Sequence, residues 1–184
     1  MSYDLNPLDA PWPAAVRASL QRYYPDRNGE YLSLFRVFAR SPRLLAKLGA
    51  AGLLDEQSPL PLREREIVIL RVTANKGCEY EWGVHVTAFR KAAGFTPEQV
   101  TATRTGPANA ACWSEREQWL LSAVDQLDGS GIMDAATREA FGQLWDTEQQ
   151  LEILALTGFY ATVSHIANTA ALPREAWAAS FPSE

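Results

Sequence analysis

The sequence contains few cysteines and few histidines, and it has no cluster of basic residues. Two cysteines and two histidines occur among 184 residues, and 17 Lys and Arg residues face 22 Asp and Glu, which gives a net charge of −5. Two cysteines are too few for a scaffold held by disulfides. A run of phosphates needs a basic surface, so we expect no nucleic-acid partner.

Neither the start of the chain nor its longest uncharged stretch has the pattern of a targeting or membrane segment. The opening residues MSYDLNPLDA lack the positive flank and apolar run of a signal peptide, which together with the low cysteine content predicts a reducing, cytoplasmic location. Residues 153–173 carry no charge, but Ser164, His165, Asn168 and other polar side chains interrupt them. We predict a helix buried in protein and no membrane partner.

Alternation of the kind that builds strands is nowhere sustained, whereas proline, glycine and capping residues divide the chain into helices. An all-α fold is therefore predicted, as one domain over residues 1–184 with N-terminal helices in 1–60, motif helices in 61–105 and a C-terminal helical half in 107–184. The expected helices cover residues 13–24, 42–52, 62–75, 79–93, 135–145 and 147–170, and two more begin after capping boxes at Thr96 and Ser114.

Two chemically useful residues share one face of the helix expected over residues 79–93. Glu81 and His85 lie four positions apart, so their Cβ atoms should be about 5–6 Å apart and the carboxylate can hold the imidazole or share a proton with it. Glu66 falls on the apolar face of the preceding helix, where His85 is its natural partner across an antiparallel pair. We predict a Glu66–His85–Glu81 cluster with Cys78 at its edge.

The rest of the charged run around Glu66 has a simpler interpretation. Arg63, Glu64 and Arg65 fall in the first turn of the helix expected over residues 62–75. We expect these three side chains to be solvated.

The segments REREIVILRV (63–72) and GCEYEWGVH (77–85) resemble the carboxymuconolactone decarboxylase family, whose superfamily also contains alkylhydroperoxidase D. The peroxidase branch carries E-x11-C-x2-C-x3-H, and this sequence matches that pattern at Glu66, Cys78 and His85. Glu81 stands where that branch has its second cysteine, so the dithiol chemistry lacks one thiol. The Glu-Tyr-Glu-Trp form is similar to the decarboxylase-like branch.

The resemblance implies an all-helical, alkylhydroperoxidase D-like fold with a central two-helix motif, assembled into dimers, trimers or hexamers with sites near subunit interfaces. It implies a lyase of aromatic catabolism that acts on a small unsaturated organic acid or lactone without a cofactor. In this hypothesis His85 is the general acid/base, Glu66 orients it and Glu81 helps to set its charge. The residues expected to line the substrate site are Tyr80, Trp82, Tyr160, His165 and Asn168.

Two other functions stay open at this point. One is a thiol peroxidase in which Cys78 is a single reactive thiol, resolved by an external thiol. The other is a helical oligomer without catalysis, in which Glu66 only holds two helices together. A metal site is not expected, because neither a Glu-x-x-His pair on two helices nor a Cys/His zinc spacing occurs.

Overall fold

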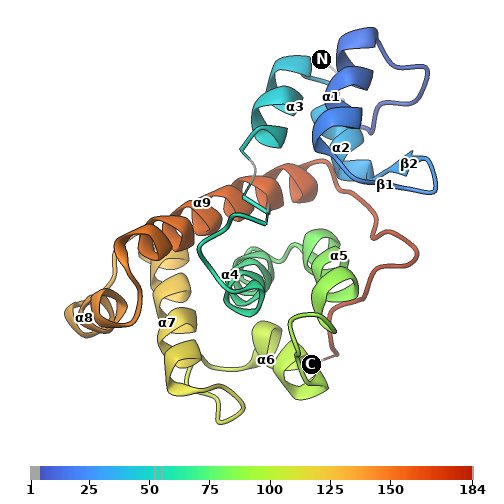
Figure 1. Ribbon diagram of the computed structural model, residues 1–184. Helices are drawn as coiled ribbons and strands as arrows, with labels where there is room; N and C mark the ends of the chain where they lie inside the picture. Colours follow the sequence, from blue (N-terminus) through green and yellow to red (C-terminus); the bar gives the residue numbers. More distant parts are fainter. Residues whose placement is uncertain (1–4, 52, 55, 184) are drawn as a thin grey trace.

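The computed structural model describes residues 5–51, 53, 54 and 56–183, and it is mostly helical (Figure 1). The all-α prediction is confirmed, apart from one β-hairpin in the described part of the chain, whose two strands have two residues each. The elements in order are α1 (Ala14–Tyr23), β1 (Asp26–Arg27), β2 (Glu30–Tyr31), α2 (Ser33–Phe38), α3 (Pro42–Gly49), α4 (Leu62–Asn75), α5 (Glu79–Phe89), α6 (Pro97–Thr105), α7 (Glu115–Ser130), α8 (Ala135–Leu144) and α9 (Thr147–Thr169).

Helix α4 is the centre of the fold. Figure 1 shows it surrounded by α5, α6, α7 and α9, and it contacts all four. Every residue from Arg65 to Ala74 is buried. The apolar residues of α4, Ile67 to Leu70 and Val72, point to several sides of the helix, which is why other elements enclose it.

Capping residues set the helix ends much as the sequence indicates. The predicted capping boxes at Thr96 and Ser114 are both formed, and Asp146 forms a third at the start of α9. Helix α5 ends at Phe89, earlier than predicted, and the chain leaves it through Gly94, whose φ is +69°. Glycine adopts this left-handed conformation without steric cost.

The N-terminal part contains two elements that the sequence analysis did not separate. Asn28 and Gly29 have positive φ values of 55° and 84°, and they form the tip of the β1–β2 hairpin. The six-residue helix α2 follows directly. No helix in the described residues is long and apolar enough to cross a membrane.

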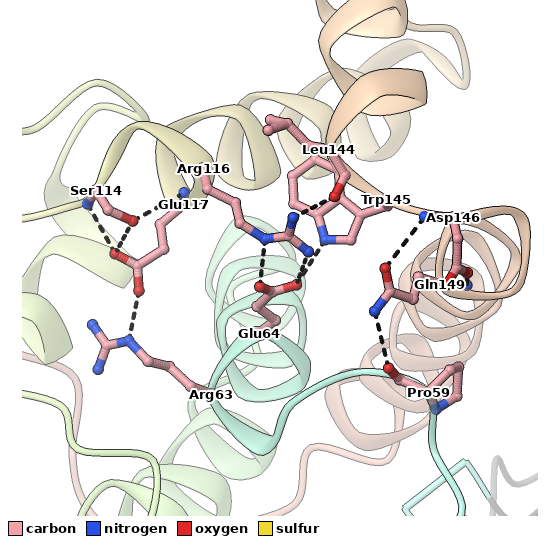
Figure 2. Close-up of polar contacts among 10 residues, drawn as sticks. All are labelled: Pro59, Arg63, Glu64, Ser114, Arg116, Glu117, Leu144, Trp145, Asp146 and Gln149. Atoms are coloured by element: carbon pink, nitrogen blue, oxygen red, sulfur yellow. Dashed lines mark hydrogen bonds and ion pairs between the residues drawn. The ribbon is translucent and has the colours of Figure 1, made fainter.

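A polar network fixes the start of α4 against α7 and the turn between α8 and α9 (Figure 2). The Glu64 carboxylate accepts hydrogen bonds from Arg116 Nε at 2.7 Å and from Trp145 Nε1 at 2.7 Å. Arg63 pairs with Glu117 at 2.5 Å. The expectation that these α4 side chains are solvated is wrong for Glu64 and Arg65, which are nearly buried, whereas Arg63 keeps 30% of its side chain exposed.

Candidate active site

A cavity of about 580 Å³ lies between the N-terminal helices and the pair formed by α5 and α9. Its wall includes residues of α1 to α3 and the hairpin, of α5, and of α9, together with Trp177 near the C-terminus. Most of the side chains are aromatic or aliphatic. The charged or titratable exceptions, tyrosines aside, are Asp26, Arg27, Glu30, Glu81 and His85.

The structure brings Glu66, Glu81 and His85 together at the inner end of this cavity. His85 Nδ1 lies 2.8 Å from Glu66 Oε2, which comes from α4. His85 Nε2 lies 3.5 Å from Glu81 Oε1, one turn earlier on α5, and 3.2 Å from the hydroxyl of Tyr160 on α9. Since Glu66 occupies Nδ1, Nε2 is the atom on the side of Glu81 and Tyr160, and both of these line the cavity.

His85 is held in its charged form by this arrangement. Burial lowers the pKa of His85, but the Glu66 carboxylate, followed by Glu81, raises it by more, to about 9. Burial and the same two carboxylates raise the pKa of the Tyr160 phenol well above its ordinary value. At neutral pH the cluster therefore contains an imidazolium with a proton to donate beside a neutral phenol.

The two carboxylate oxygens of Glu81 differ in their contacts. Oε1 faces His85, whereas Oε2 is buried and has no hydrogen-bond partner. The residue is 6% exposed and lines the cavity. A buried carboxylate oxygen without a donor is costly, so this atom is suited to accept a proton or hydrogen bond from a bound molecule.

Cys78 lies outside the cavity wall. It is the N-cap of α5, its exposed fraction is 0%, and it packs in the apolar cluster with Val84 and Val163. Burial raises the pKa of the Cys78 thiol, and the charge of Glu81 adds to the rise. Both effects favour the protonated thiol over the thiolate, which is the nucleophilic form.

Of the five residues expected to line the substrate site, Tyr160 is the one that lines this cavity. Trp82 points toward α6, where its Nε1 donates to Thr103 Oγ1 at 3.0 Å, and Tyr80 donates to Glu175 at 2.6 Å. Neighbours in a helix are rotated by about 100°, so a residue next to Glu81 does not share its direction.

The two α9 residues fall outside the cavity for the same reason. His165 is exposed on the outer face of the helix. Asn168 is exposed too, and its Nδ2 donates to the backbone oxygen of Lys76 at 2.8 Å. Contrary to the expectation from the sequence, neither His165 nor Asn168 lines this cavity.

The sequence analysis missed the outer wall of the cavity. It is formed by aromatic and aliphatic residues from four separate segments, including Tyr24, Phe35, Phe38, Leu48 and Trp177. A concentration of aromatic residues over positions 23–38 is the only signal in the sequence. Within the described ranges, no group of three or more His, Cys, Asp or Glu residues is arranged to hold a metal ion.

A family model described as the carboxymuconolactone decarboxylase family matches residues 40–126, which contain α4, α5 and the whole Glu66–His85–Glu81 cluster. This part of the chain belongs to the carboxymuconolactone decarboxylase family. A search of curated protein sequences finds no significant match.

Solved structures of low sequence identity share the fold. A peroxidase-related protein from Silicibacter sp. TM1040 is 20% identical with a TM-score of 0.75, covering 95% of this chain and 91% of that one. For a peroxidase-related alkylhydroperoxidase core protein from Ralstonia eutropha JMP134 the values are 19%, 0.75, 95% and 95%. A debrominase in complex with 2,3,4-tribromopyrrole is 15% identical with a TM-score of 0.73, covering 96% and 94%. The chain thus has an alkylhydroperoxidase-like fold.

Proposed function

We propose that this chain is an acid–base enzyme of the carboxymuconolactone decarboxylase family that needs no cofactor and transfers protons at a carbon atom of a small unsaturated molecule. The observation that carries the proposal is the buried Glu66–His85–Glu81 cluster at the inner end of an open cavity. His85 is the general acid, Glu66 orients it through Nδ1, and Glu81 is the group that faces the substrate.

Decarboxylation, which the family name suggests, is one reaction that this cluster supports. The bond between carbon and carboxylate breaks, carbon dioxide leaves, and the electron pair enters the conjugated system. The carbon then takes the proton from His85 Nε2, and His85 recovers a proton from solvent. No oxidant or reductant takes part.

The two other functions have less support. A peroxidase needs an accessible thiolate, whereas Cys78 is fully buried and its pKa is raised by that burial. A purely structural protein has no need for an open cavity beside a charged buried cluster. Self-association into dimers, trimers or hexamers, with the cavity near an interface, remains part of the proposal.

Deuterium incorporation tests the proposal directly. The enzyme is incubated in D₂O with a panel of unsaturated lactone acids and enolisable ring compounds, and products are analysed by mass spectrometry for lost carbon dioxide and for deuterium bound to carbon. We expect wild-type protein and the His165→Gln control to incorporate deuterium at the same rate. His85→Gln should be slower by about 100-fold, the usual range for a lost general acid. Unchanged incorporation in His85→Gln would refute the proposal.

A further inference from the structure

We propose that the cavity takes an uncharged, mostly apolar ring compound that carries one O–H or N–H group, and that Glu81 Oε2 accepts a hydrogen bond from this group. The inference rests on the proposed function, because it assigns a substrate class to the same site. It departs from the organic acid that the family resemblance suggests, and among proton transfers at carbon it favours the tautomerisation of a neutral molecule over decarboxylation.

The free oxygen of Glu81 specifies a donor. Oε2 is buried without a partner while it belongs to a residue of the cavity wall. A ligand that offers only acceptors, such as an ether or an ester, leaves this oxygen unsatisfied. An O–H or N–H group removes the penalty, which makes it the feature that the site selects.

The charges along the wall disfavour an anion. Glu81, Asp26 and Glu30 are acidic, and Glu66 lies directly behind His85. These carboxylates are opposed by three cations, and none of the three is free of a contact within the described structure. His85 is held between Glu66 and Glu81, Arg27 stacks 4.3 Å from the centre of the Trp177 ring, and Arg65 lies 3.4 Å from Glu66. A carboxylate that enters the inner end meets Glu81 at short range in an apolar surrounding, where repulsion between like charges is strong.

Size and lining indicate a ring compound. A cavity of about 580 Å³ is in the middle of the usual range for small-molecule sites, and it exceeds the needs of a single small lactone. The inner wall around His85 includes Phe89, Phe159 and Tyr160. Aromatic side chains of this kind pack well against a planar ring.

The same contact gives a balanced reaction. Glu81 Oε2 takes the proton of the ligand O–H group, and the electron pair left on that oxygen forms the C=O bond. The electron pair of the C=C bond then takes a proton from His85 Nε2 at the neighbouring carbon, so that an enol becomes a ketone. The ligand gains and loses one proton and is neither oxidised nor reduced. Because Glu81 Oε1 is 3.5 Å from His85 Nε2, the proton can then return from Glu81 to His85.

Three probes that share one ring system differ in whether they carry a hydrogen-bond donor, only an acceptor, or a negative charge. Binding of 2-naphthol, 2-methoxynaphthalene and 2-naphthoate to the full-length protein is measured by equilibrium dialysis at pH 7. We expect 2-naphthol to bind at least about tenfold more tightly than either of the others, as one satisfied buried hydrogen bond implies. Equal affinity for 2-naphthol and 2-methoxynaphthalene, tighter binding of 2-naphthoate, or no binding of any probe overturns the inference.

The variant Glu81→Gln tests whether Glu81 is responsible for the preference for 2-naphthol. It should weaken 2-naphthol binding by about fivefold or more and strengthen 2-naphthoate binding, because the negative charge is gone. Glu98→Gln, an exposed carboxylate on α6 outside the cavity wall, should change neither. If 2-naphthoate does not gain affinity in a folded Glu81→Gln protein, the argument that the charge of Glu81 repels anions is wrong. If that variant does not fold, the three probes on the wild-type protein still test the inference.

Exchange of the C1 hydrogen of 2-naphthol in D₂O distinguishes the two proposals. Selective binding of 2-naphthol without faster exchange leaves the ligand class intact and refutes proton transfer at carbon. Faster exchange without the binding preference supports proton transfer and refutes the ligand class.

Discussion

His85 is only 3% exposed, so the loss of hydration makes the charged form of its side chain less favourable. Desolvation alone would make it neutral, and the Glu66 and Glu81 carboxylates reverse that outcome. The charge state of His85 therefore depends on two side chains that come from different helices.

Replacing Glu66 by Gln should shift the pH dependence of activity. In the wild-type protein, activity needs protonated His85, so kcat/KM should fall as the pH rises through about 9. Glu66→Gln removes the carboxylate 2.8 Å from Nδ1, and the alkaline limb should move to lower pH with at least a roughly tenfold loss of kcat/KM at pH 8. A pH–rate profile of both proteins, with the substrate found by deuterium incorporation, checks this. An unmoved alkaline limb would mean that Glu66 does not set the charge of His85.

Replacing Cys78 by Ala should leave catalysis in place. The thiol is buried away from the cavity wall, so kcat/KM should stay within about twofold, while the lost packing costs about 1 kcal/mol of stability. Steady-state kinetics and urea denaturation measure the two effects. Loss of activity in a folded Cys78→Ala protein would return the thiol peroxidase to consideration.

The C-terminal segment is an element whose position depends on one glycine of α5. Ala179 N donates to Thr87 Oγ1 at 2.9 Å and to Gly83 O at 3.2 Å, and the segment continues to Phe181, whose ring packs 5.2 Å from Trp82. An added Cβ at Gly83 would lie 2.1 Å from the Ala179 oxygen. Only glycine allows the segment to run this close to the helix.

Gly83→Ala should therefore release or distort the C-terminal segment. We expect a loss of about 1–3 kcal/mol in the free energy of unfolding and faster proteolysis after residue 172. Gly142→Ala in α8 is the matched control, since its added Cβ meets nothing within 4 Å, and it should stabilise the protein by about 0.5–1 kcal/mol. Urea denaturation and limited proteolysis decide the question, and equal stability of the two variants would contradict the assigned packing.

Helices α4 and α5 show which elements the sequence could predict. The bounds of α4, Leu62–Asn75, agree with the prediction because Pro61 and Gly77 end the helix on both sides, and the pairing of Glu66 with His85 follows from the helical period across two adjacent helices. Helix α2 was missed because six residues are too few for a periodic pattern. Trp82 was misplaced because a buried helix is apolar on several faces, so its pattern does not say which face meets the cavity.

The cavity belongs to the whole molecule, and this is why its outer wall could not be predicted. Tyr24, Phe35, Leu48 and Trp177 come from four separate segments and meet only in the folded chain. Local sequence patterns do not predict such long-range contacts.

The stability of the whole molecule should also depend on His85. Its folded pKa of about 9 lies above the ordinary value of 6.5, so the stabilising contribution is complete below pH 6.5, decreases as the pH rises and is lost above about pH 9. The difference corresponds to about 3 kcal/mol. Urea denaturation between pH 6 and 10 should show this decrease in the wild-type protein and a much smaller one in His85→Gln. The same slope in both proteins would assign it to other groups.

The most direct test of the account is the protonation state of His85 itself. The chain has two histidines, so a His165→Gln protein gives a single imidazole signal in a ¹³C-labelled NMR titration. We predict a titration midpoint near pH 9 for that signal. A midpoint at or below 6.5 would show that His85 is neutral at physiological pH, and it would contradict the proposal that His85 is the acid that protonates the substrate.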